Sequence, residues 1–407
     1  MKKILFMGVI LFTSFFLHAQ SEAEGVRFMD NEPWENVLQK ANEQNRWVFV
    51  DCYTSWCGPC KRLASEVFTQ KEVGDFLNSR FVCVKYDVEK ENGLAFARKY
   101  REYITAFPTL LMIRPEDGNL MHRIVGFYPA ENILQEVQNG IDGRTWQMMA
   151  KEYEAGKRDL PFVKEYLNSL ATANEEKRYQ EVVMGYIKSF PMDSLMNKEI
   201  WELGEVYIND PHSEEFQYIL HHLNDFTNRG FNRYSLEWKM AINIYYRVSD
   251  IVQTGFKTAQ QDTVQALLDE IAQLQKLLKH PVKSFPEYRA CLLLMESYLE
   301  HNRQALFAHL TEFIACRLLS NLEWTAAWAD DLIEHLKSKE QIRQCVELLI
   351  RVQKEEEEGN NWVIRNCYGT IAKGYARLGD KKKAQEYYRM EEEVNKRNAE
   401  KMKNFGL

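Results

Sequence analysis

Short apolar runs and amphipathic stretches alternate along the first third of the chain. The apolar runs are rich in β-branched and aromatic residues, as strands are, and cover residues 47–50, 81–84, 109–113 and 122–125. Apolar residues recur at helical spacing around these runs, at 34–42, 61–78, 94–103 and 131–139. A Glu-Asp-Gly-Asn turn at 116–119 joins the last two runs as a hairpin. This alternation predicts an α/β fold, a mixed sheet covered by helices.

The pattern changes after Gly140. From Trp146 onward there is almost no strand pattern, and apolar residues recur at helical spacing, for example at Phe162, Tyr166 and Leu170. We therefore expect an all-α domain. Near its end, residues 367–388, with Gly379-Asp380 at the turn, resemble one tetratricopeptide-type helix pair. Two interpretations stay open for this domain: a helical array that only packs, or a surface that binds a partner.

The first twenty residues have the features of an export signal. Lys2 and Lys3 precede an uncharged apolar run over residues 4–17, and Ala19 lies at a suitable cleavage site. The run is shorter than the ~20 residues that a membrane-spanning helix needs, which disfavours a membrane anchor. We therefore expect a signal peptide at 1–19, an α/β domain at 20–140 and a helical domain at 141–407.

Hydropathy and charge limit where the protein is expected to act and which classes of partner it can bind. No later segment is both long and uncharged enough to span a membrane, so we expect a soluble mature protein in the periplasm of a two-membrane bacterium. The net charge of the 407-residue chain is −7, and no basic stripe offers contacts for phosphates. We therefore expect no nucleic-acid partner.

Three cysteines, Cys52, Cys57 and Cys60, lie close together, and three kinds of site compete to explain them. Their spacing matches iron–sulfur ligands of the plant type. However, Cys52 continues a predicted strand, and an exported chain would have to acquire its cluster after export. A zinc site needs four ligands, usually in two close pairs, and Cys83 stands alone. The other cysteines are scattered through the helical region, at Cys291, Cys316, Cys345 and Cys367.

The favoured interpretation is a dithiol that cycles with its disulfide. Cys57-Gly58-Pro59-Cys60 follows a predicted strand and opens a predicted helix, where backbone N–H groups and the helix dipole favour a thiolate at Cys57. Cys60, one turn into the helix, is expected to be more buried than Cys57 and to act as the resolving cysteine. Pro59 suits a first helical turn, and Gly58 allows a docking chain to come close. No other cofactor and no metal is expected.

These residues resemble the active site of the thioredoxin family. Trp56 to Lys61 reads as the family's signature, and the resemblance extends over 34–137. It also covers further positions of the family's site and fold: Asp51, Lys85, Phe107-Pro108-Thr109 and Gly126. The resemblance implies a thioredoxin fold with a cis Phe107–Pro108 bond, and it is greatest to the exported bacterial thiol reductases.

The resemblance also implies roles for individual residues. Cys57 would attack a substrate disulfide and Cys60 would resolve the mixed disulfide. Asp51, with a pKa raised by burial, would take the proton of Cys60 and be accompanied by Lys85. Substrate contacts would come from the residues around the thiols: Trp56, Gly58, Pro59, Phe107 and Pro108. Phe107 is bulkier than the family's usual residue, and Cys52 should point to the opposite face of its strand and serve packing.

The sequence thus predicts an exported thiol–disulfide oxidoreductase that reduces protein disulfides. The Gly-Pro pair between Cys57 and Cys60 resembles that of reductants, and its electrons would come from a thiol donor in the membrane. One alternative is an interaction protein whose helical domain binds a partner. Another is a disulfide isomerase or oxidase, which would need a less reducing couple.

Overall fold

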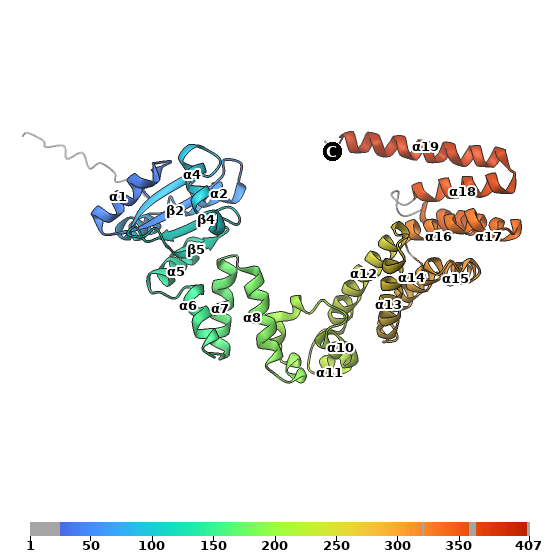
Figure 1. Cartoon of the computed structure of the whole chain (residues 1–407), viewed down its shortest axis with the longest axis horizontal. Helices are drawn as coiled ribbons and strands as arrows, with labels where there is room; N and C mark the ends of the chain where they lie inside the picture. Colours follow the sequence, from blue (N-terminus) through green and yellow to red (C-terminus); the bar gives the residue numbers. More distant parts are fainter. Residues whose placement is uncertain (1–24, 320, 358–363, 405–407) are drawn as a thin grey trace, which may run out of the picture. The chain divides into compact units, whose positions relative to one another are not determined.

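The computed structural model describes residues 25–319, 321–357 and 364–404 (Figure 1). The chain divides into two compact units, one ending at Phe190 and one beginning at Pro191. The predicted signal peptide at 1–19 lies outside the described residues. Within the described parts of the chain, none of the helices combines the length and apolarity required to cross a membrane.

The first unit contains a five-stranded mixed sheet in the order β1-β3-β2-β4-β5. β1 and β2 both run parallel to β3, whereas β4 is antiparallel to β2 and to β5. The strands are β1 (Met29–Asp30), β2 (Trp47–Tyr53), β3 (Phe81–Asp87), β4 (Thr109–Ile113) and β5 (Leu120–Val125). The predicted α/β fold with a mixed sheet is therefore confirmed.

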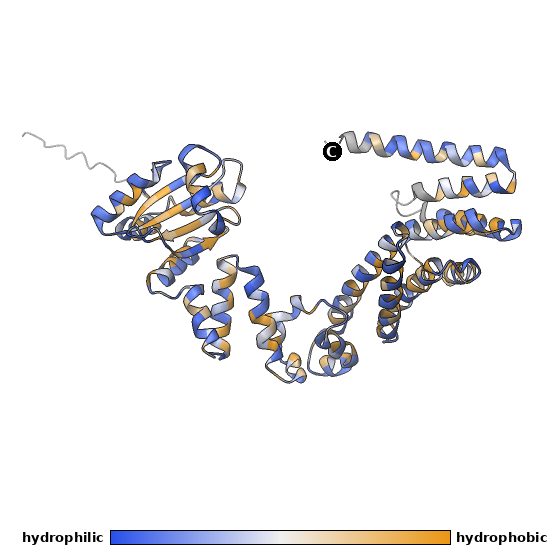
Figure 2. Cartoon of the chain, viewed as in Figure 1, coloured by the Kyte–Doolittle hydropathy of each residue, from blue (hydrophilic) through white to orange (hydrophobic). Residues whose placement is uncertain are grey.

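Helices cover both faces of the sheet because the strands bury side chains on both. On one face, Val50 and Cys52 pack in a core with residues of α1 (Trp34–Gln44) and α4 (Glu91–Lys99). On the other, Phe49 packs in a core with residues of α3 (Lys71–Arg80) and α5 (Ala130–Ile141). The strands are largely hydrophobic, whereas the helices carry both kinds of residue (Figure 2). Strand alternation therefore decides which side chains can reach a given site.

The helical stretch predicted over 61–78 is interrupted in the structure. It comprises α2 (Gly58–Arg62), the π-helical turn η1 (Leu63–Val67) and α3, which begins at Lys71. Gln70 is extended, and the amide of Val26 donates to the carbonyl of Phe68 at 2.8 Å. The chain before β1 thus takes up a carbonyl at the break, a long-range contact that no local pattern encodes. A similar break separates α4 from the short helix η2 (Arg101–Tyr103).

Three helices that follow α5 also belong to the first unit: α6 (Trp146–Glu154), α7 (Leu160–Thr172) and α8 (Glu176–Lys188). Asp159 caps α7 by accepting the amide of Phe162 at 3.1 Å. The apolar positions read from the sequence, Phe162, Tyr166 and Leu170, are buried as their spacing predicts. The domain boundary predicted at 140 remains a prediction.

The described residues of the second unit form helices and connecting turns and no strands, as predicted. Its helices are α9 (Lys198–Gly204), α10 (Glu214–His221), α11 (Leu223–Asn228), α12 (Arg233–Lys257), α13 (Gln261–Leu277), α14 (Phe285–Leu299), α15 (Arg303–Ala315), α16 (Leu322–His335), α17 (Lys339–Glu357), α18 (Ile364–Leu378) and α19 (Lys381–Asn404), with short 3₁₀ turns η3 (Met192–Met196) and η4 (Glu205–Tyr207). The predicted turn of the last pair is present, because Gly379 has a φ of 91° and Asp380 accepts the amide of Lys383 at 3.0 Å. Gly374 lies against Val346, where a Cβ would not fit.

Candidate active site

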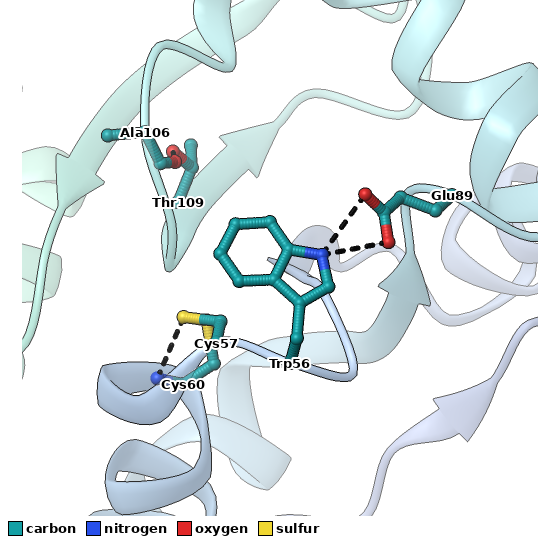
Figure 3. Close-up of a disulfide and its surroundings, with 6 residues drawn as sticks. All are labelled: Trp56, Cys57, Cys60, Glu89, Ala106 and Thr109. Carbon is teal, nitrogen blue, oxygen red and sulfur yellow. Dashed lines mark hydrogen bonds between the residues drawn. A yellow bond between two sulfur atoms is a disulfide. The ribbon is translucent and has the colours of Figure 1, made fainter. Parts of the chain in front are cut away.

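Cys57 and Cys60 form a disulfide where β2 leads into α2. Their Cα atoms are 5.3 Å apart, and Cys57 occupies the N-cap of α2. The Cys57 sulfur accepts the backbone N–H of Cys60 at 3.2 Å (Figure 3). Pro59 lies in the first turn, where its missing N–H leaves no intrahelical bond unmade. In the reduced form the same N–H can stabilise negative charge on Cys57.

The two cysteines do not differ in exposure. Cys57 is 4% exposed and Cys60 5%, so the prediction that Cys60 is the more buried of the two was wrong for this state. In the disulfide each sulfur covers part of the other, which removes the difference expected from their places in the helix. Gly58 and Pro59 between them are exposed, so access to the pair runs over this turn.

Asp51 is a buried carboxyl on β2 with little compensation for its charge. Its side chain is 6% exposed, and the oxygen Oδ1 has no hydrogen-bond partner among the described residues. Burial raises the pKa of Asp51 to about 7, an effect that the positive charge of Lys85 partly offsets. By strand alternation Asp51 lies on the same face as Phe49, whose core includes Leu63 of η1. A carboxyl titrating near pH 7 can accept or donate a proton at neutral pH.

Lys85 lies beside Asp51 but forms its ion pair with another carboxylate. The two residues are directly paired in the register of β2 and β3, and Lys85 Nζ lies 3.1 Å from Asp30 Oδ2 on β1. The structure thus brings Lys85 to the carboxyl, as the resemblance implied. Asp30 was not recognised from the sequence, because only the pairing of β1 with β3 brings it there.

The loop before β4 supplies the second side of the site. The Phe107–Pro108 bond is cis, and the carbonyl of Pro108 accepts the amide of Gly126 at 2.8 Å. Pro108 is buried, whereas Phe107 is partly exposed and packs edge-on against Trp56, with ring centroids 6.3 Å apart. In the view of Figure 3 the loop from Ala106 to Thr109 descends toward the disulfide.

Trp56 presents a largely exposed ring next to the disulfide. It is 66% exposed, and its Nε1 donates to both carboxylate oxygens of Glu89, at 3.2 and 3.1 Å. Figure 3 shows the indole between the disulfide and Glu89. Glu89 was missed by sequence reasoning, since it belongs to an exposed charged run with no pattern of its own. Trp56, Phe107 and the thiol pair together form a surface on which a substrate chain can lie.

Cys52 is separated from the thiol pair, as predicted. It is fully buried in the core that faces α1 and α4, and burial with the nearby charge of Asp51 raises its thiol pKa well above the ordinary value. Cys83, also buried, lies in the opposite core. In the described chain the cysteines other than Cys57 and Cys60 form no disulfide, including those of the second unit: Cys291, Cys316, Cys345 and Cys367. The three clustered cysteines thus do not converge on one centre.

Comparison with known proteins agrees with this geometry. The family model for a thioredoxin-like domain matches residues 34–141. The chain is 33% identical over 102 residues to thioredoxin of Mycoplasma genitalium, covering 25% of this chain and 90% of that protein. It is 32% identical over 108 residues to chloroplastic thioredoxin Y2 of Arabidopsis thaliana, covering 26% of this chain and 58% of that protein.

A solved structure is also similar. The solution structure of a proposed disulphide-isomerase from Bacteroides thetaiotaomicron matches at 38% identity and a TM-score of 0.27, covering 30% of this chain and 97% of that one. The chain spans little more than half the length of thioredoxin Y2, so the match concerns the domain around the disulfide. That domain is homologous to thiol–disulfide oxidoreductases and carries their paired cysteines, Cys57 and Cys60. Through it, the chain belongs to the thioredoxin family.

Proposed function

We propose that this protein is a periplasmic thiol–disulfide oxidoreductase that reduces protein disulfides through Cys57 and Cys60. The observation that carries the proposal is the hydrogen bond from the Cys60 amide to the Cys57 sulfur at the start of α2. A donor aimed at that sulfur stabilises the thiolate, which is the attacking form. The exported location rests on the predicted signal peptide at 1–19.

The reaction transfers two electrons to the substrate. The Cys57 thiolate attacks one sulfur of the substrate disulfide, forms a mixed disulfide and releases the other sulfur as a thiolate, which takes a proton from water. Cys60 then gives its proton to the Asp51 carboxylate and attacks the Cys57 sulfur. The second substrate thiolate leaves, and the Cys57–Cys60 disulfide remains. Another dithiol must then reduce it, and for an exported protein we infer a thiol donor in the membrane.

Docking of the substrate would use the surface beside the disulfide. The cis turn before Pro108 leaves backbone groups near the thiols, where an extended chain can pair with them. The exposed indole of Trp56 and the ring of Phe107 add apolar contact area. Gly58 has no side chain to obstruct the approach, and the space that a Cβ would occupy there is open.

The reduction potential of the Cys57–Cys60 couple tests the direction of transfer. The full-length mature protein would be equilibrated with glutathione buffers and its thiols trapped. We expect a value near that of thioredoxins themselves, about −270 mV. A value near about −180 mV would indicate an isomerase and one near about −120 mV an oxidant, and either would overturn the reductant proposal. Failure to exchange would remove the enzymatic function altogether.

A protein that acts mainly by binding is the second candidate, and one observation favours it. In the second unit Tyr234 and Trp238, one helical turn apart on α12, are 77% and 59% exposed, and with Val206 they line a cavity of about 630 Å³. Large exposed aromatic residues are typical of binding surfaces. The Cys57→Ser variant separates the two functions, because it abolishes reduction but leaves a binding function intact.

A further inference from the structure

The turn between α7 and α8 contacts the loop that leads to Pro108. Asn174 Nδ2 donates to Thr105 Oγ1 at 3.0 Å. The next residue, Glu175, accepts a hydrogen bond from Nη2 of Arg123 on β5. Nη1 of the same guanidinium donates to the carbonyl of Tyr103 at 3.2 Å. One turn of the helical segment thus holds the stretch from Tyr103 to Thr105, directly before the substrate-binding loop.

Burial makes the contact through Arg123 obligatory. The Arg123 side chain is 2% exposed, and a buried guanidinium is costly unless a carboxylate pairs with it. Glu175 provides that carboxylate. It occupies the N-cap of α8, yet its side chain makes no capping bond there, because it is directed to Arg123 instead. The Glu175 carboxylate therefore binds Arg123 on β5 instead of capping α8.

The position of this turn is itself fixed by α7. Asn168 Nδ2 donates to Glu136 Oε1 on α5 at 3.4 Å. Thr172, the last residue of α7, lies one helical turn after Asn168 on the same side of the helix. Asn174 then takes a left-handed conformation, with φ of 56°, which reverses the chain toward Thr105. The contact of α7 with α5 thus places the turn between α7 and α8 beside the loop before Pro108.

We propose that Asn174 and Glu175 are positioning residues that hold the substrate-binding loop and so favour protein disulfides over small ones. The proposal rests on the proposed function. A protein substrate must pair with the backbone near Phe107, and a loop already ordered lowers the entropic cost of that pairing. A small disulfide needs only the Cys57 sulfur. The α6–α8 segment would thus add a selectivity that the thioredoxin-like domain alone lacks.

The test compares two substrates with the full-length mature protein. Asn174→Ala and Glu175→Gln should each raise KM for insulin about fivefold, the loss of one hydrogen bond, with little change in kcat. The rate with 5,5′-dithiobis(2-nitrobenzoate) and the reduction potential should stay unchanged. The amides of residues 104–107 and 109 should exchange faster with solvent in both variants. Asn174→Ala keeps the test valid if Glu175→Gln, which leaves Arg123 without its carboxylate, fails to fold.

Matched control variants exclude general effects. Asn45→Ala replaces another left-handed asparagine, which ends α1 just before β2, and Glu72→Gln replaces an exposed glutamate in the first turn of α3. Both should behave as wild type. Unchanged KM for insulin in Asn174→Ala, or equal losses with both substrates, would overturn the positioning role. A wild-type protein inert toward the small disulfide would overturn the proposed function instead, while the amide exchange would still test the loop contact.

Discussion

Asp51 and Lys85 occupy directly paired positions on the parallel strands β2 and β3, yet the ion pair of Lys85 is made with Asp30. The charge of Lys85 therefore acts on two carboxylates: it forms an ion pair with Asp30 and lowers the pKa of Asp51. Lys85 lowers the pKa of Asp51 less than burial raises it, and the net result is a pKa of about 7. This relationship places a titrating carboxyl on the face of the sheet that η1 covers, and three of the following predictions depend on it.

Replacing Asp51 by asparagine should stabilise the oxidised protein at alkaline pH. The pKa of Asp51 is about 7 in the folded state, against an ordinary value of 3.8, so between these values the folded state binds more protons than the unfolded state. The stability contributed by protonated Asp51 is therefore present below about pH 4 and lost as the pH rises through about 7. At pH 8 the free energy of unfolding of Asp51→Asn should therefore exceed that of wild type by on the order of 4 kcal/mol.

Urea unfolding of the oxidised protein at several pH values measures this difference. The difference in the free energy of unfolding between Asp51→Asn and wild type should disappear as the pH falls toward 4. Asp75→Asn, on the exposed side of α3 and paired with Lys71, is the control and should show no such trend. A gap that is the same at pH 4 and pH 8 would show that Asp51 does not titrate in this range.

Sequence reasoning recovered the local parts of the site and missed the parts that depend on tertiary pairing. Cys57, Gly58, Pro59 and Cys60 could be predicted because strand, turn and helix start follow one another in the chain. The opposite orientation of Cys52 followed from strand alternation. Local patterns were insufficient wherever a partner came from a distant segment.

The missed partners illustrate this limit. Asp30 reaches Lys85 only through the two-residue strand β1, too short to leave a pattern. Glu89 reaches Trp56 from an exposed charged run, and Asn174 reaches Thr105 across 69 positions. The break before α3 likewise depends on Val26, which binds a carbonyl that the helix would otherwise use.

The resolving step should depend on the ionisation of Asp51. If Asp51 accepts the proton of Cys60, the decay of the mixed disulfide accelerates as the pH rises through about 7. Asp51→Asn should slow this decay about a hundredfold at pH 8 and remove the inflection. Acid quenching of the mixed disulfide at short times measures the decay, and Cys60→Ser marks the rate without resolution. An inflection that persists in Asp51→Asn would assign the proton to another group.

Lys85→Met should shift the pH dependence of the mixed-disulfide decay toward alkaline pH. The positive charge of Lys85 lowers the pKa of Asp51, so its removal leaves burial unopposed and raises that pKa further above about 7. The inflection in the mixed-disulfide decay should move upward with little change in the plateau. Lys71→Met, which removes an exposed lysine of α3, is the control. An unmoved inflection in Lys85→Met would mean that Lys85 does not act on the carboxyl.

Cys52 should stay inert toward alkylating agents in the folded protein, although it lies five residues from the attacking cysteine. It is fully buried, and burial together with the charge of Asp51 keeps its thiol protonated, whereas alkylation needs an accessible thiolate. After iodoacetamide treatment of the oxidised native protein, peptide mass spectrometry should find Cys316, which is exposed, labelled and Cys52 unlabelled. Cys52→Ala should leave the reduction potential of the Cys57–Cys60 couple unchanged and cost about 1 kcal/mol of stability for the lost packing. Rapid labelling of Cys52, or a shifted potential in Cys52→Ala, would instead make it a third redox group.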